Sequence, residues 1–159
     1  MSSKNKSLKR SAKGLFFEDN TEEVSKLLGN LGYLAENFGF YQKSADLNER
    51  ALEIAEMIFG KDHPNVAVSQ SNLANVYSDL GRYDKAAELL ETALESDLKN
   101  FGKDHPTVAV RQSNLAWVHK NIGQDTRAKE LWQSAYQNYL NNLGAEHPHT
   151  ISFKQWSEM

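Results

Sequence analysis

The chain has 159 residues, of which 40% are hydrophobic and 25% charged, with a formal net charge of −3. This balance is ordinary for a folded protein and argues against wholesale disorder. The absence of cysteine excludes disulfides, thiolate metal sites and cysteine nucleophiles. Since no apolar run is long enough to span a bilayer, we expect a cytoplasmic protein.

The N-terminal segment differs from the rest of the chain in charge. Residues 1–17 contain five lysines and arginines and no acidic residue, whereas the remainder is acidic. We interpret residues 1–19 as a basic, disordered arm, and a solvated leader is the simplest reading. Such an arm could also bind an anionic surface, nucleic acid or the acidic body itself. Nucleic acid is not the partner that we expect.

From residue 20 onward the sequence repeats with a fixed interval. Three related pentapeptides, GKDHP, GKDHP and GAEHP, begin at Gly60, Gly102 and Gly144, and these glycines are 42 residues apart. A constant period of this length indicates a repeat architecture. We divide the domain at 20–159 into units of about 22–63, 64–105 and 106–147, followed by residues 148–159.

The central unit predicts two helices. The first begins at Pro64, a residue suited to the first turn, and ends before Gly81, which suits the position after a helix. The second, over residues 82–102, has apolar residues at spacings of three and four, the pattern of one helix face. Because no segment alternates with period two, we expect an all-α fold without a sheet.

Small residues predict where the two helices of each pair cross, since they let two backbones approach closely. The three sets are Gly32, Ser44 and Ala51; Ala74, Ala86 and Ala93; Ala116, Ala128 and Ala135.

These positions resemble the tetratricopeptide repeat, whose motif is matched here by Leu73, Ala74, Tyr77, Gly81, Tyr83, Ala86, Leu90 and Ala93. The usual repeat has about 34 residues. The 42-residue unit is similar to the longer version found in kinesin light chains. The resemblance covers roughly residues 22–159. It implies a right-handed α-solenoid of antiparallel helix pairs, about three units plus a capping helix at 148–159. In the competing account, residues 148–159 belong to a longer array.

The recurrent histidines, His63, His105 and His147, each precede a helix-starting proline. We interpret them as structural loop residues, because histidines one repeat apart cannot converge on one metal ion. The acidic residues before them (Asp62, Asp104 and Glu146) are expected to accept hydrogen bonds at the helix start. We expect neither a metal nor another cofactor.

Asparagine recurs inside the first helix of each unit, at Asn30, Asn72 and Asn114. Mid-helix asparagine is mildly unfavourable, so each is expected to have a reason. We favour a hydrogen bond to the backbone of the neighbouring unit over a role in ligand binding.

The resemblance implies that the first helices line a concave surface where a partner binds. Carried onto this sequence, the candidate partner-binding residues are Tyr33, Glu36, Ser71, Asn75, Asp79, Ser113, Trp117, Lys120 and Asn121. We expect Tyr33, Asn75 and Trp117 to anchor a partner peptide. The alternative for Trp117 is packing against the terminal helix, near Trp156.

Two ligand classes of the family fit poorly. Chaperone-binding members clamp a terminal carboxylate with basic residues on the first helices, where this chain has Gly29, Ser71 and Ser113. Kinesin light chains take acidic, tryptophan-containing peptides on a basic groove, whereas this groove combines Lys120 with Glu36 and Asp79.

No motif for catalysis occurs, neither a glycine-rich phosphate loop nor a GxSxG segment, so we expect a non-enzyme. The function that we expect is a protein–protein interaction module. Two alternatives stay open. One is a self-associating structural piece or a fragment of a larger repeat protein. The other is an anionic-surface or nucleic-acid binder that acts through the basic arm.

Overall fold

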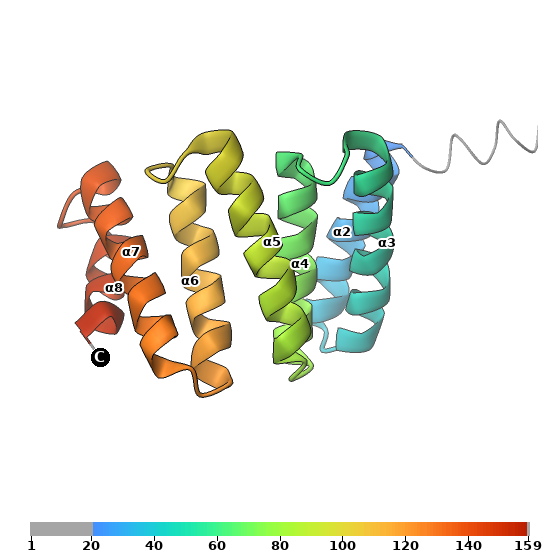
Figure 1. The fold of residues 1–159 in the computed structure, drawn as a ribbon. Helices are drawn as coiled ribbons and strands as arrows, with labels where there is room; N and C mark the ends of the chain where they lie inside the picture. The colour runs from blue at the N-terminus through green and yellow to red at the C-terminus, as the bar shows by residue number, and fades with distance from the viewer. Residues whose placement is uncertain (1–20, 159) are drawn as a thin grey trace, which may run out of the picture.

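The computed structural model describes residues 21–158, and the expected basic arm at residues 1–19 lies outside them. The described residues form seven helices and no strand. They are α2 (Glu22–Asn37), α3 (Tyr41–Phe59), α4 (Pro64–Asp79), α5 (Tyr83–Phe101), α6 (Pro106–Asn121), α7 (Asp125–Leu143) and α8 (Pro148–Glu158). Figure 1 shows the helix pairs stacked side by side in chain order. The predicted all-α fold is confirmed.

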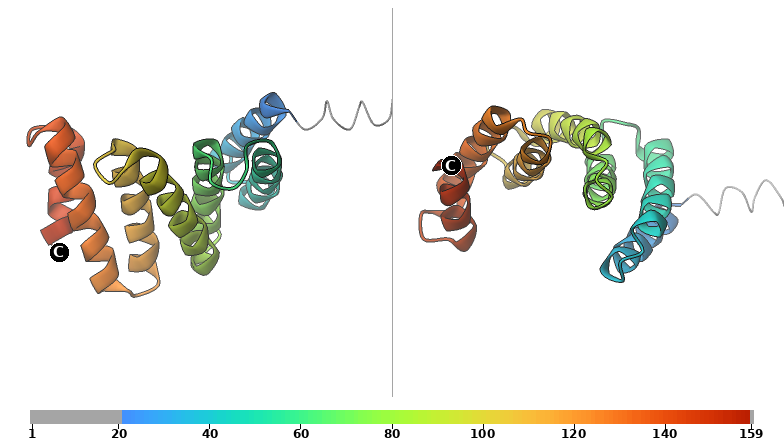
Figure 2. Two further views of the ribbon diagram at one scale, coloured as in Figure 1. Left: turned by 45° about the horizontal axis from the view of Figure 1, so that its top comes forward. Right: turned by 90° about the horizontal axis from the view of Figure 1, so that it is seen from below.

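The helices pack as consecutive pairs into a right-handed solenoid. Helix α2 packs on α3, α4 on α5 and α6 on α7, while α8 packs on α7. Along the described chain, α2 also contacts α4 and α4 contacts α6, but α3, α5 and α7 do not contact one another. The first helices of the pairs therefore lie on the inner side of the curve. Figure 2 shows that the stacked pairs follow an arc.

The crossing points within each pair are built from the small residues that the sequence predicts. Ala74, Ala86 and Ala93 are fully buried, and the corresponding residues of the other two pairs are buried as well. Larger side chains, Leu73 and Leu90 among them, fill the space around the crossing of α4 and α5 in one apolar cluster. Close approach at small residues lets these side chains interdigitate.

The turn within the pair of α4 and α5 depends on Gly81. Its φ of 70° lies in the left-handed region, which glycine adopts without steric cost. The N–H of Gly81 donates to the Ser78 carbonyl at 2.9 Å, and the N–H of Arg82 donates to the Tyr77 carbonyl at 2.7 Å. These bonds satisfy carbonyls at the end of α4.

The pentapeptide between units caps the next helix through its histidine. The Nδ1 atom of His63 accepts from the N–H of Asn65 at 3.1 Å, and the imidazole stacks on Phe59 with 4.5 Å between the ring centroids. His105 makes the same two contacts, with Thr107 and Phe101, and His147 accepts from the N–H of His149. The structural role that we predict for these histidines is confirmed.

The expectation that the acidic residue before each histidine caps the helix is wrong. The imidazole occupies the capping position, and Asp62 lies one residue too early to reach the free N–H groups. The Asp62 carboxylate instead pairs with Lys99, with 2.6 Å between Oδ2 and Nζ.

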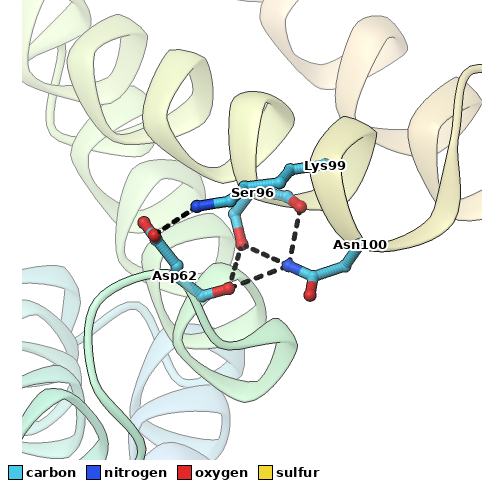
Figure 3. A network of polar contacts seen from close by, with 4 residues as sticks. All are labelled: Asp62, Ser96, Lys99 and Asn100. Atoms are coloured by element: carbon cyan, nitrogen blue, oxygen red, sulfur yellow. Dashed lines mark hydrogen bonds and ion pairs between the residues drawn. The ribbon is translucent and has the colours of Figure 1, made fainter.

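The last turns of α5 and α7 hold in place the loop that precedes each unit. The Asp62 carbonyl accepts from Ser96 Oγ at 3.0 Å and from Asn100 Nδ2 at 2.8 Å, as Figure 3 shows. One repeat later, Asn142 donates to the Asp104 carbonyl at 2.8 Å, and Asn138 donates to the carbonyls of Lys103 and His105. The extension of the second helix thus fixes the junction between units.

Candidate functional site: the concave groove

Two adjoining hollows on the inner face form the candidate site. The first has a volume of about 600 Å³ and lies between α2, α3 and α4. The second has a volume of about 280 Å³ and is lined by residues of α2, α4 and α6. Glu36 and Asn75 line both, so the two hollows are continuous. We call them together the concave groove.

The first hollow lies beside helices in which the first unit uses smaller and more polar residues than the second unit. Gly32 and Asn48 occupy the positions that Ala74 and Leu90 hold one repeat later. Asn48 lines the hollow together with Ala51 and Ala55, although only 3% of it is exposed.

The carboxamide of Asn48 has a fixed orientation. Its Nδ2 donates to the Ser44 carbonyl at 2.9 Å and to Ser44 Oγ at 3.2 Å. Because the carbonyl can only accept, the nitrogen must face Ser44. The Oδ1 atom of Asn48 accepts no hydrogen bond from any residue between 21 and 158.

The second hollow combines carboxylates, carboxamides and one aromatic ring. Trp117 is 42% exposed and lines it beside Glu36, Asp79 and Asn121. The same ring contacts Trp156 of α8 edge-on, with 4.6 Å between the centroids. Packing against the terminal helix is therefore confirmed for Trp117, and the rest of its surface faces the groove.

The centre of the groove is acidic. Burial raises the pKa of Glu36, and the negative charge of Asp79 raises it further. Neither carboxylate has an ion-pair partner in the described part of the chain. The nearest lysines of the inner helices are already paired, since Lys26 contacts Glu22 and Lys120 contacts Asp125.

Six of the nine predicted partner-binding residues line the concave groove: Tyr33, Glu36, Asn75, Asp79, Trp117 and Asn121. Ser71 and Ser113 do not, because both are buried between packed helices, and Ser113 Oγ donates to the Ala109 carbonyl at 2.7 Å. Lys120 lines neither hollow, and its Nζ lies 2.9 Å from Asp125 Oδ1 at the following turn.

The recurrent asparagines are groove residues, which contradicts the structural role that we expected. Asn30 and Asn72 line the first hollow and are exposed, and Asn114 lines the second. None of the three side chains bonds to a neighbouring unit among the described residues. The sequence contained an indication of this position: Asn72 is three residues from the predicted groove residue Asn75, so the two share one helix face.

Residues 21–158 contain neither a metal-binding cluster nor a membrane-spanning helix. No three histidine, aspartate or glutamate side chains come together as a metal site. None of these helices is long and apolar enough to cross a membrane.

Comparison with known proteins places these features among repeat proteins. The family model for the tetratricopeptide repeat matches residues 23–99 and 79–141. A Podosopora anserina structure of kinesin-light-chain type, with nearly identical TPR-like repeats, has a TM-score of 0.80 and 25% identity, covering 86% of this chain and 65% of that chain. BtubC (BKLC) from P. vanneervenii has a TM-score of 0.72 and 26% identity, covering 91% and 57%.

A third structure is the first TPR of Spaghetti (RPAP3) bound to the HSP90 peptide SRMEEVD. Its TM-score is 0.60 at 14% identity, covering 87% of this chain and 97% of that one, a likeness of fold. This chain spans less than two thirds of the length of the first two structures. No curated protein matches the chain.

Proposed function

Because the chain belongs to the tetratricopeptide repeat family, with repeats of the kinesin-light-chain-like type, we propose that it is a non-catalytic protein-interaction module. In this proposal the concave groove binds an extended peptide segment of a partner protein. The observation that carries it is the row of carboxamides along the inner helices: Asn30, Asn72, Asn75, Asn114 and Asn121.

Carboxamides suit an extended peptide for a chemical reason. Each has two N–H donors and an acceptor oxygen, so it can match both the carbonyls and the N–H groups of a peptide backbone. An extended peptide leaves those groups unpaired along its whole length. The exposed rings of Tyr33 and Trp117 add apolar contact area at either end of the row.

The RPAP3 structure supports peptide binding by this fold, but its ligand is an acidic segment. The basic residues that the family uses to clamp a terminal carboxylate are replaced here by Gly29, Ser71 and Ser113. Since such a clamp needs charge-assisted donors, we propose an internal segment of a partner rather than a terminal carboxylate.

The test is a selection of random peptides displayed on phage, run against the full chain. The groove variant is Tyr33→Ala with Asn75→Ala. The matched control, Tyr41→Ala with Gln137→Ala, also removes an exposed tyrosine and an exposed carboxamide, but outside the groove. Circular dichroism establishes that both variants are folded.

Peptides that bind the control variant but no longer bind the groove variant would support the proposal. Peptides that bind both variants equally would overturn it. A deletion of residues 1–17 separates the alternative: binding that disappears with that segment would assign the interaction to the basic arm.

A further inference from the structure

The charge of the concave groove is not neutralised by the chain itself. Elsewhere in residues 21–158, some acidic residues form ion pairs: Asp62 with Lys99, Asp97 with Arg111, Glu91 with Arg127 and Asp125 with Lys120. Glu36 and Asp79 instead face each other across the second hollow without a cation. Ionised carboxylates only accept hydrogen bonds, so a ligand that contacts both must offer donors or a positive charge.

A second, independent feature of the groove is an acceptor that the described chain leaves open. Asn48 is 3% exposed and lines the first hollow, and its Oδ1 atom accepts no hydrogen bond from the described chain. This oxygen is not one of the fully buried atoms without a partner, so it opens to the hollow and can accept from a donor that enters there. The first hollow, at about 600 Å³, has room for a long side chain that reaches this atom.

Each hollow of the groove is lined by an exposed aromatic ring as well as by acceptors. Tyr33 and Glu36 are one turn apart on α2, and both line the first hollow. Trp117 lines the second hollow with Glu36 and Asp79. A cation that contacts a carboxylate and a ring face at once gains from both.

Resting on the proposed function, we infer that the partner segment is a basic peptide and that it carries arginine. The guanidinium group has five donors and no acceptor, it pairs with carboxylates in a fork, and it stacks on aromatic rings. One arginine of the segment contacts Glu36 and Asp79 beside Trp117. A second enters the first hollow and donates to Asn48 Oδ1.

The probe is a fluorescein-labelled nine-residue peptide in which arginine alternates with alanine, measured by fluorescence anisotropy against the full chain. We expect the arginine peptide to bind, the lysine version to bind more weakly, and the glutamate version not to bind. The groove variant Glu36→Gln with Asp79→Asn is expected to weaken the arginine peptide about tenfold or more.

A matched control separates a specific site from general attraction to an acidic protein. Glu88→Gln with Glu130→Gln removes the same charge from exposed positions of α5 and α7. We expect this control to change the affinity less than about twofold, because charges far from the site are screened. Equal weakening by both pairs would overturn the inference.

Asn48→Leu gives a second readout, because leucine is the residue at the corresponding position of the second unit. It removes the acceptor and is expected to weaken the arginine peptide about fivefold relative to wild type. An unchanged affinity would overturn the role of Asn48.

Two outcomes distinguish this inference from the proposed function and from another occupant. Groove-dependent peptides without arginine in the phage selection would overturn the inference and leave the proposed function intact. If deleting residues 1–17 raises the affinity for the arginine peptide about tenfold, the occupant is the basic segment of this chain, and the inference of a partner segment is overturned.

Discussion

Gly32 and Asn48 make the first helix pair different from the other two. Both residues are buried, and a Cβ atom placed on Gly32 would overlap the Asn48 carboxamide. The repeat pattern predicts a small residue at position 32, but not the reason for glycine. The large apolar side chain expected at position 48 is missing, so its space is shared between asparagine and the first hollow.

Gly32→Ala should therefore destabilise the protein by about 1–3 kcal/mol, the range for overpacking a buried position. The measurement is urea unfolding followed by circular dichroism. In an Asn48→Ala background the same substitution should cost less, because the obstructing carboxamide is gone. Equal costs in the two backgrounds would contradict the contact.

The buried ion pair of Asp97 and Arg111 joins α5 to α6. Arg111 Nε lies 2.9 Å from Asp97 Oδ2, as an ion pair without the alignment of a hydrogen bond. One repeat later the two positions hold Tyr139 and Phe153, whose rings stack with 5.1 Å between centroids. One junction is thus charged and the next is apolar.

Arg111→Met should cost about 3–5 kcal/mol, because it leaves the Asp97 carboxylate buried without its cation. Burial already raises the pKa of Asp97, and Arg111 opposes that effect. The double variant Asp97→Tyr with Arg111→Phe, which copies the next junction, should cost less than the single variant. Chemical denaturation of the two variants provides the comparison, and a double variant that loses more stability than Arg111→Met would argue against the pairing.

The ionised Glu36 carboxylate should lower the free energy of unfolding of the unbound protein. Burial and the charge of Asp79 raise its pKa in the folded state, so ionised Glu36 disfavours folding at neutral pH. As the pH falls through the raised pKa, the folded state takes up a proton before the unfolded state does, and the cost disappears.

Glu36→Gln should consequently raise Tm at neutral pH, and the gain should vanish well below the ordinary pKa of 4.5. Thermal unfolding at the two pH values measures this. A lower Tm for Glu36→Gln at neutral pH would show instead that the carboxylate stabilises the fold.

At the scale of the element, the last turns of the long helix α5 hold the loop before α4, a role that the apolar pattern of α5 does not indicate. Asn100 and Ser96 of α5 donate to the backbone carbonyl of Asp62, in the loop before α4. The sequence predicted the helix and the structural nature of the pentapeptide. It did not predict the contact of Ser96 and Asn100 with this loop. Every residue has a backbone carbonyl, so the identity of the accepting residue does not indicate such a bond.

Replacing Asn100 by alanine should cost about 1 kcal/mol, the usual net contribution of one hydrogen bond. The loss should be local as well: amides of the loop at residues 60–63 should exchange with solvent faster, while those in the middle of α5 should not. Hydrogen exchange measures both. Uniformly faster exchange would show that the contact is not confined to this junction.

At the scale of the whole molecule, the period of 42 residues was sufficient for the architecture. Proline at the start of α4, α6 and α8 and glycine just after the ends of α2 to α7 indicated the boundaries closely, and the small residues identified the crossings. The groove was predicted less completely. Ser71 and Ser113 were predicted to face the groove, but both are buried. Their positions in the repeat motif do not indicate how far a short side chain lies below the surface.

The structural role predicted for the recurrent asparagines was wrong for a different reason. A polar residue repeated within helices is compatible with a buried hydrogen bond or with an exposed binding face. Only the arrangement of α2, α4 and α6 in space distinguishes the two possibilities. The first hollow was equally unpredicted, because Asn48 lines it from α3 and Gly32 of α2 leaves the space that the Asn48 carboxamide occupies.

In the proposed function, the inner face formed by α2, α4 and α6 binds the partner. The most direct test is a two-dimensional NMR titration of the full chain with a peptide from the phage selection. Peptide binding in the groove should shift the side-chain amide signals of Asn30, Asn72 and Asn75 and signals along the inner helices, with α3, α5 and α7 unchanged at their exposed positions. Shifts confined to those outer helices, or to residues 1–17, would contradict the proposed function.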